Sequence, residues 1–232
     1  MRPLAIDLFC GLGGWAEGLL AEGYSVIGFD IERHQYGAHR YPGLLVVQDV
    51  STLHGAQFKD AALIVASPPC QEYSYMAMPW KLAKARAAAI RADTSGTALE
   101  RLNRLFDACF RIQKEASTAA GRHVPMVVEN VRGAIPWVGR SRWNFGSFHL
   151  WGDVPALMPY GRAIKVPGFR LAPGPVHWGR RTNTGKGARF TSRGCGIERI
   201  KQGVGTSRKQ ASAMIAKIPE PLARHVAAAF RP

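Results

Sequence analysis

The chain has 232 residues, 47% of them hydrophobic and 20% charged, and this composition excludes a wholly disordered protein. No apolar run approaches the length of a membrane span, and the stretch MRPLAIDLFC lacks a small-residue cleavage site, so we expect neither membrane insertion nor a signal peptide. Lys and Arg number 31 against 16 Asp and Glu, a formal charge of +15, which favours a polyanionic partner such as nucleic acid.

Strand-like and helix-like segments alternate through the first half of the chain. Short apolar runs predict strands at residues 4–9, 25–30, 44–50, 62–69 and 124–131. Segments with helix-favouring composition predict helices at residues 15–23, 81–92 and 98–120. Strands that alternate with helices predict an α/β fold, in which helices cover both faces of a parallel sheet.

The second half has a different composition. Residues 133–209 are rich in Gly, Pro, Trp and Arg, and pieces such as GSFHLWGD predict irregular β structure and loops. Between Tyr160 and Lys209 there are twelve Lys and Arg but one acid, Glu198. We expect three parts: a main domain at 1–152, a small basic region at 153–205, and a helical segment at 206–232 that packs back on the main domain. A merely solvated basic face is the alternative explanation of the charge.

The four cysteines, Cys10, Cys70, Cys109 and Cys195, are widely scattered. No pair has C-x-x-C spacing and no cysteine–histidine cluster indicates zinc, so we expect no metal site. Free thiols favour a reducing, cytoplasmic compartment.

Polar residues gather where the predicted strands end. The glycine-rich CGLGG follows the first strand, and Gly11 and Gly13 let a ligand approach the backbone, although a tight strand–helix turn explains them equally well. Asp30 ends the second strand, where doubly wound folds commonly hold a ribose, and Asp49 ends VVQD at the same edge. Together these strand ends predict a nucleoside-shaped pocket.

Two further strand ends carry reactive groups. The stretch VASPPCQEYS places Cys70 just beyond a strand, where the thiol is either a nucleophile or an inert buried side chain. Glu129 and Asn130 end the strong β run VVENV, and such polar groups are poor core fillers. We therefore favour Cys70 as a nucleophile that is paired with the carboxyl group of Glu129.

The motifs DLFCGLGG, SPPCQ and ENV, in that order, resemble the cofactor, nucleophile and acid motifs of DNA cytosine-5 methyltransferases, over about residues 4–135. The resemblance implies a Rossmann-like S-adenosylmethionine-dependent methyltransferase sheet with a small, irregular β/loop DNA-recognition region. It implies S-adenosyl-L-methionine as the cofactor, bound by the following residues: Phe9, Gly11, Gly13, Asp30, Ile31, Asp49 and Pro69.

The resemblance also implies a reaction. Cys70 would add to C6 of a flipped-out cytosine and activate C5 toward the methyl group, while Glu129, beside Asn130, would protonate or contact N3. Arg140 and Arg142 stand where the family has Q-x-R-x-R, but the Gln is missing, and simple phosphate contact is an equal alternative. The family's closing G-N-x-V is absent as well. The expected DNA contacts are Gln71, Ser74, Arg180, Arg181, Lys186 and Arg189.

Two other functions stay open. One branch of the family methylates transfer RNA, but that branch departs from the PCQ seen here, which favours DNA. A non-catalytic DNA-binding relic is the second alternative, and the intact Cys70 and Glu129 count against it. We expect a monomeric restriction-modification or orphan enzyme that acts on double-stranded DNA in the cytoplasm of a bacterial or phage-infected cell.

Overall fold

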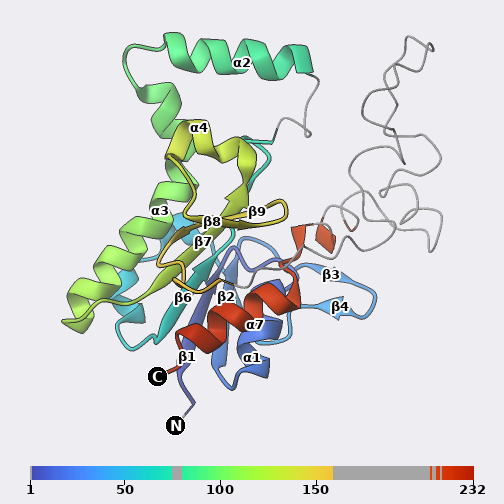
Figure 1. Cartoon of the computed structure of the whole chain (residues 1–232), viewed down its shortest axis with the longest axis vertical. Helices are drawn as coiled ribbons and strands as arrows, with labels where there is room; N and C mark the ends of the chain where they lie inside the picture. The colour runs from blue at the N-terminus through green and yellow to red at the C-terminus, as the bar shows by residue number, and fades with distance from the viewer. Residues whose placement is uncertain (1, 75–79, 159–209, 211–212, 215) are drawn as a thin grey trace. The chain divides into compact units, whose positions relative to one another are not determined.

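The computed structural model describes residues 2–74, 80–158, 210, 213–214 and 216–232. Contacts divide the chain into two units: the first is Met1–Arg162 with Ile218–Pro232, and the second is Ala163–Lys217. Every helix and strand named below belongs to the first unit (Figure 1). The predicted DNA contacts Arg180, Arg181, Lys186 and Arg189 lie outside the described residues.

A seven-stranded sheet forms the centre of the first unit. Its spatial order is β5 (Leu44–Val47), β2 (Ser25–Asp30), β1 (Leu4–Leu8), β6 (Leu63–Ala66), β7 (Met126–Val131), β9 (Phe148–Gly152) and β8 (Trp143–Phe145). The first five strands run parallel, and β9 is antiparallel to both β7 and β8. The sheet is therefore mixed rather than wholly parallel, because the β8–β9 hairpin extends one side. The α/β arrangement agrees with the expected Rossmann-like methyltransferase fold.

Apolar side chains explain why this sheet is buried on both faces. All four residues of β6, LIVA, are buried, as expected for a central strand of a parallel sheet. On one face the long helix α3 (Thr97–Ala120) packs Phe106 and Ile112 onto sheet residues such as Ile6 and Ile64. The short helices η1 (Val50–Thr52) and η2 (Gly55–Phe58) lie on the same side, where Val50 and Phe58 join this core.

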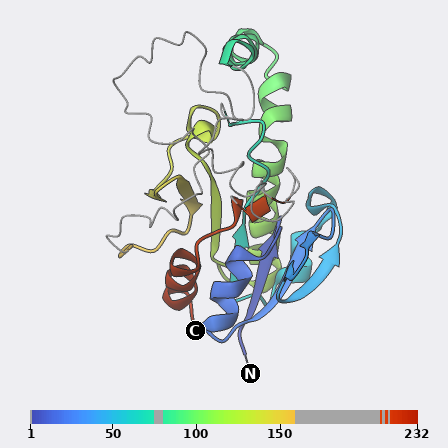
Figure 2. The same cartoon turned by 90° about the vertical axis from the view of Figure 1, so that its right-hand side faces the viewer.

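The opposite face is covered by α1 (Gly14–Ala21) and α7 (Glu220–Ala229), which lie side by side (Figures 1 and 2). Glycine permits this close approach: a Cβ built at Gly18 would lie 2.4 Å from the Cβ of Ala223. The C-terminal helix thus belongs to the same unit as the first strand, although almost the whole chain separates them.

The remaining described elements are short, apart from one helix. They are the hairpin β3 (Gln35–Tyr36) and β4 (His39–Arg40), the helix α2 (Trp80–Ala92), and the turns of helix η3 (Arg132–Ala134) and α4 (Ile135–Val138). Within the described ranges no helix is long and apolar enough to cross a bilayer. The same residues contain no cluster of His, Cys, Asp and Glu that could hold a metal ion.

The strand register places the ends of the parallel strands in one row. Leu8 pairs with both Phe29 and Ala66, and Ala66 pairs with Val128. The residues that follow in each strand, Asp30, Phe9, Ser67 and Glu129, therefore emerge next to one another at the carboxyl edge. Ligands bind at this edge in open α/β sheets.

Candidate active site

The nucleophile candidate lies on a tight turn after β6. The Cys70 carbonyl accepts hydrogen bonds from the backbone N–H groups of Tyr73 (3.0 Å) and Ser74 (2.9 Å). The buried Tyr73 fixes this turn to α3, because its hydroxyl donates to the Asn103 Oδ1 at 3.0 Å. Among the described cysteines, Cys10 and Cys109 are buried, whereas Cys70 is partly exposed. Cys70 is thus held in a fixed place and can still be reached by a substrate.

Glu129 is buried beside this turn, at the end of β7. Burial raises the pKa of its carboxyl group to about 8, and a hydrogen bond from the Ser67 side chain opposes this shift in part. Ser67 lies next to Glu129 in the strand register and accepts a hydrogen bond from the Trp15 Nε1 at 3.0 Å. At neutral pH, Glu129 is a carboxylic acid that can give up a proton.

The thiol and the carboxyl group influence each other. Burial raises the pKa of Cys70 to about 11, and the negative charge that Glu129 carries when ionised adds to this shift. The structure therefore brings together the predicted pair, with both groups neutral near pH 7 before a substrate binds.

Asn130 stabilises the turn that carries Cys70 through a hydrogen bond to the backbone. Its Nδ2 donates to the Pro68 carbonyl at 2.9 Å, and its Oδ1 accepts from the Val131 N–H at 2.8 Å. The side chain is almost fully buried, with 1% of the residue exposed. These contacts make Asn130 a positioning residue for the SPPC turn.

The glycine-rich loop adopts a conformation that L residues rarely take. Phe9, Gly11 and Gly13 have φ angles of 56°, 50° and 78°. The Gly11 N–H donates to the Asp30 Oδ2 at 2.9 Å, which joins the ends of β1 and β2. A Cβ at Gly11 would meet no atom within 4 Å, so the loop is open to a ligand at that point.

Apolar surface lies beside this opening. Ile31, directly after Asp30, is 70% exposed, and Phe9 is half-buried against the core. A carboxylate flanked by open backbone and exposed apolar side chains suits a nucleoside, whose ribose is polar and whose base is flat. The residues present therefore fit the predicted cofactor.

Of the other predicted contacts, Asp49 has a role within the fold, and three more residues surround the turn that carries Cys70. Asp49 caps η1, accepting from the Ser51 N–H at 2.8 Å, and this hydrogen bond lowers the pKa of its carboxyl group. Pro69 and Gln71 are exposed and Ser74 is half-buried, all around the nucleophile turn.

The arginine pair lies before β8. Arg140 and Arg142 are both exposed, while Ser141 between them is half-buried and hydrogen-bonds the Nδ1 of His149 at 3.0 Å. His149 is paired with Asn130 across β7 and β9. The hydrogen bond of Ser141 fixes the turn that carries both guanidinium groups, and sequence reasoning did not identify His149.

A second feature missed from the sequence lies under the glycine-rich loop. Tyr41 occupies the space that side chains at Gly13 and Gly28 would need: a Cβ at these positions would lie 2.9 Å and 2.3 Å from its ring. The Tyr41 hydroxyl donates to the Oδ2 of the fully buried Asp7 at 3.2 Å. Burial raises the pKa of Asp7 well above its usual range. In the sequence, the acidic Asp7 within the apolar run LAIDLF is the signal that could have indicated a buried polar contact.

A known protein family matches the part of the sequence that carries this site. The family model described as C-5 cytosine-specific DNA methylase matches residues 4–134, more than half of the chain. The match includes the glycine-rich loop, the Cys70 turn and Glu129. A search among curated proteins finds no match.

Solved structures that are similar to parts of the chain include three methyltransferases. A protein assigned as a DNA modification methyltransferase from an E. coli prophage is 26% identical, with a TM-score of 0.37, over 58% of this chain and 33% of that one. S. pombe Dnmt2 methyltransferase is 18% identical (TM-score 0.35; 58% and 36% of the two chains). Entamoeba histolytica methyltransferase EhMeth is 17% identical (TM-score 0.33; 57% and 39%). The matched part is less than two fifths of each of these proteins.

Proposed function

The chain belongs to the C-5 cytosine-specific DNA methylase family, and we propose on this basis that it transfers a methyl group from S-adenosyl-L-methionine to C5 of cytosine in double-stranded DNA. The observation that carries the proposal is the partly exposed Cys70 thiol beside the buried carboxyl group of Glu129, whose pKa is raised by burial. Both groups lie at the sheet edge that also carries the open glycine-rich loop.

Cys70 and Glu129 together account for the activation of cytosine C5, the difficult part of the proposed reaction. Cytosine C5 is a weak nucleophile while the ring is aromatic. The Cys70 thiol first loses its proton to water. Addition of the resulting thiolate to C6 forms a C–S bond and breaks the aromaticity, and the negative charge develops toward N3. Glu129 delivers its proton to N3, so the negative charge passes to the Glu129 carboxylate and does not build up on the cytosine ring. C5 is then electron-rich enough to take a methyl group.

Each neighbouring group holds a part in place. Asn130 and the turn hydrogen bonds of Cys70 keep the sulfur at the sheet edge. Asp30, Gly11 and Ile31 would hold the cofactor, which supplies an electrophilic methyl group when bound. Loss of the C5 proton to water, release of Cys70 as a thiolate and return of the N3 proton to Glu129 complete the reaction. Because C5 and C6 are inaccessible inside a duplex, the target base must be flipped out.

A mechanism-based trap tests the proposal. Double-stranded DNA that contains 5-fluorocytosine should form a covalent adduct in the presence of S-adenosyl-L-methionine, because fluorine at C5 cannot leave as a proton does. Denaturing gel electrophoresis detects the adduct. Cys70→Ser should abolish it while DNA affinity stays within a few-fold, and Cys195→Ala is the matched control that should keep it.

The other outcomes identify the alternatives. Adducts with the matched RNA oligonucleotide but not with DNA would assign the enzyme to RNA. DNA binding without an adduct in any substrate sequence would indicate a non-catalytic relic of the fold.

A further inference from the structure

The long helix α3 carries a buried amide side chain close to the turn that holds Cys70. Among the described residues, six polar or charged residues are buried. Five of them lie on strands of the sheet: Asp7, Asp30, Glu129, Asn130 and His149. The sixth, Asn103, lies on α3, where its neighbours Leu102 and Phe106 belong to the apolar core. Burial of an amide among apolar groups costs free energy unless the amide is hydrogen-bonded, so its partners indicate what it does.

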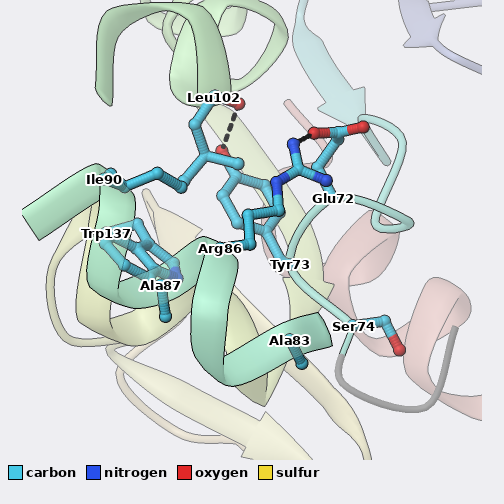
Figure 3. Close-up of a pocket in the computed structure, with 9 residues that line it drawn as sticks. All are labelled: Glu72, Tyr73, Ser74, Ala83, Arg86, Ala87, Ile90, Leu102 and Trp137. Atoms are coloured by element: carbon cyan, nitrogen blue, oxygen red, sulfur yellow. Dashed lines mark hydrogen bonds and ion pairs between the residues drawn. The ribbon is translucent and has the colours of Figure 1, made fainter. Parts of the chain in front are cut away.

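The two ends of the Asn103 amide bind two separate segments of the candidate active site. Its Oδ1 accepts a hydrogen bond at 3.0 Å from the hydroxyl of Tyr73, three residues after Cys70. Its Nδ2 donates at 3.0 Å to the carbonyl of Trp137, three residues before Arg140. Tyr73 and Trp137 both line the small pocket drawn in Figure 3. Asn103 therefore connects the turn of the nucleophile to the segment that carries the arginine pair.

The Trp137 carbonyl fixes the direction of these hydrogen bonds. A carbonyl can only accept, so the amide nitrogen of Asn103 must face it, and the amide oxygen then faces Tyr73. The Tyr73 hydroxyl is the donor in this contact, and the Leu102 carbonyl, 3.3 Å from the same hydroxyl, is a second acceptor (Figure 3). A side chain that lacks either the donor or the acceptor of Asn103 cannot bridge the two segments.

The segment that follows Trp137 is held to the sheet as well. The Trp151 Nε1 donates to the Gly139 carbonyl at 3.0 Å, and the Arg142 N–H donates to a carbonyl of β9 at 2.8 Å. These contacts attach the segment to β9, whereas the contact from Asn103 attaches it to α3. The arginine pair is thus placed from two elements, and only the contact on α3 also reaches the turn of the nucleophile through a single side chain.

We propose that Asn103 is a positioning residue of the active site, which sets the place of Cys70 relative to Arg140 and Arg142. The inference rests on the proposed function, in which both segments face the same flipped nucleotide. Reacting groups must meet in a narrow geometry, and a misplacement of about 1 Å can lower a rate about 100-fold. An amide that only filled the core would stabilise the protein without such an effect on the rate.

The rate of adduct formation with 5-fluorocytosine DNA, at saturating DNA and cofactor, tests this role. Asn103→Leu keeps the branched shape of the side chain but removes both hydrogen bonds. It should lower that rate about 10–100-fold. The affinity for S-adenosyl-L-methionine, measured by calorimetry, should stay within a few-fold.

Gln113→Met is the matched control. The Gln113 amide lies on the same helix and also has two partners, the Val124 carbonyl and the Asp153 carboxylate, at the amino edge of β7. Loss of these hydrogen bonds should lower the free energy of unfolding in urea and leave the adduct rate of the folded protein unchanged.

Asn103→Asp gives a readout that a purely structural role would not move. A protonated carboxyl group can accept from Tyr73 through one oxygen and donate to the Trp137 carbonyl through the other, as the amide does. An ionised carboxylate cannot donate. The adduct rate of Asn103→Asp relative to that of the unmodified protein should therefore be highest at low pH and fall as pH rises. Asp107 and Cys109, whose charges also act on Tyr73, are present in both proteins, so the ratio of rates removes their influence.

Tyr73→Phe removes only the first of the two hydrogen bonds. It should lower the adduct rate of the unmodified protein, but it should cause little further loss in Asn103→Leu, because both residues act through one contact. An equal loss in the two backgrounds would show that Tyr73 and Asn103 act separately and would overturn the proposed connection.

The remaining outcomes are distinct. A full adduct rate in folded Asn103→Leu, or a rate ratio of Asn103→Asp that does not change with pH, would show that Asn103 only stabilises the fold. If Asn103→Leu does not fold, the rate ratio of Asn103→Asp decides alone. Absence of any adduct in the unmodified protein would instead contradict the proposed function.

Discussion

Glu129 and Cys70 form a coupled acid pair, and in the proposed methyl transfer their protonation decides when the reaction can begin. With pKa values of about 8 for Glu129 and about 11 for Cys70, both protons are present at neutral pH. Attack needs a thiolate that faces a protonated carboxyl group, which is the pair with one proton removed. The population of the singly protonated pair rises with pH up to about 8 and then levels off.

We expect kcat/KM for DNA to rise toward pH 8 and to stay level above it, measured by transfer of labelled methyl groups between pH 5 and 10. Glu129→Gln should lower the rate about 10²–10⁴-fold and remove the levelling-off near pH 8, because the thiolate population of Cys70 then keeps rising through the measured range. Glu100→Gln, an exposed change on α3, is the control. A rate that is flat below pH 8 and falls above it would show that the thiol loses its proton during the attack.

Asp7 gives a second pH dependence, this time in stability. Its pKa is raised by burial in the folded protein, whereas the unfolded chain has an ordinary value near 3.8. The folded state therefore keeps a proton that the unfolded state loses, and stability falls as pH rises above that value. Glu129 has the same sign, so a comparison between variants is needed to separate the two.

Asp7→Asn removes the titration but keeps an acceptor for the Tyr41 hydroxyl. The stability of the variant relative to the unmodified protein should increase steadily from pH 4 to pH 7 in urea unfolding experiments. Parallel stability curves for the two proteins would show that Asp7 does not titrate abnormally. Tyr24→Phe removes another buried hydroxyl, one bonded to the Ala227 carbonyl, and should shift stability without this change in pH dependence.

Residue roles differed in how far they could be predicted. The proximity of Cys70 and Glu129 could be predicted because reactive groups at strand ends stand out in an apolar sequence, and the register brings the two strand ends together; their roles stay predictions. Asp7 and Tyr41 are 34 positions apart and meet through an irregular segment, so no local pattern indicates their contact. Asn130 was expected to face a ligand because an amide at a strand end is a poor core filler, while its hydrogen bond to Pro68 depends on the three-dimensional turn.

At the scale of elements, the contact between α1 and α7 depends on a missing side chain. In an ordinary helix, Gly→Ala stabilises by about 1 kcal/mol. At Gly18, however, the new Cβ would lie 2.4 Å from the Ala223 Cβ and 2.6 Å from the Arg224 N. Backbone atoms of α7 would have to move, and overpacking of this kind typically costs about 1–3 kcal/mol.

We therefore expect Gly18→Ala to lower the free energy of unfolding, measured with urea, despite the better helix propensity of alanine. Ala21→Gly, at an exposed position of the same helix, reports the propensity effect alone. A Gly18→Ala variant that is more stable than the unmodified protein would show that the two helices are not in tight contact.

Long apolar runs made most elements predictable. The strand at Ser25–Asp30 has the predicted bounds, and the helices Trp80–Ala92 and Thr97–Ala120 each begin one residue early. The hairpin β3–β4 and the single turn α4 were missed, since strands of two residues and helices of four carry no detectable periodicity. The antiparallel β8–β9 pair changes the sheet from parallel to mixed, and its polar, aromatic sequence did not reveal the direction.

At the scale of the whole molecule, charge and chemistry occupy different parts of the sequence. The family motifs lie before residue 135, whereas the densest basic stretch, Tyr160 to Lys209, lies outside the described residues. Composition predicts such a division, but it cannot supply the spatial order of strands, which required the register of each pair.

The Ser67 hydroxyl connects Trp15 to Glu129 and sets the direction of the hydrogen bonds between them. An indole N–H can only donate, so Ser67 accepts from Trp15 and keeps its hydroxyl proton for a second partner, the Glu129 carboxyl group. When Ser67 donates to one oxygen of the protonated carboxyl group, the acidic proton lies on the other oxygen. A chain of hydrogen bonds from α1 through the end of β6 to β7 thus holds the Glu129 carboxyl group in one orientation before any ligand binds.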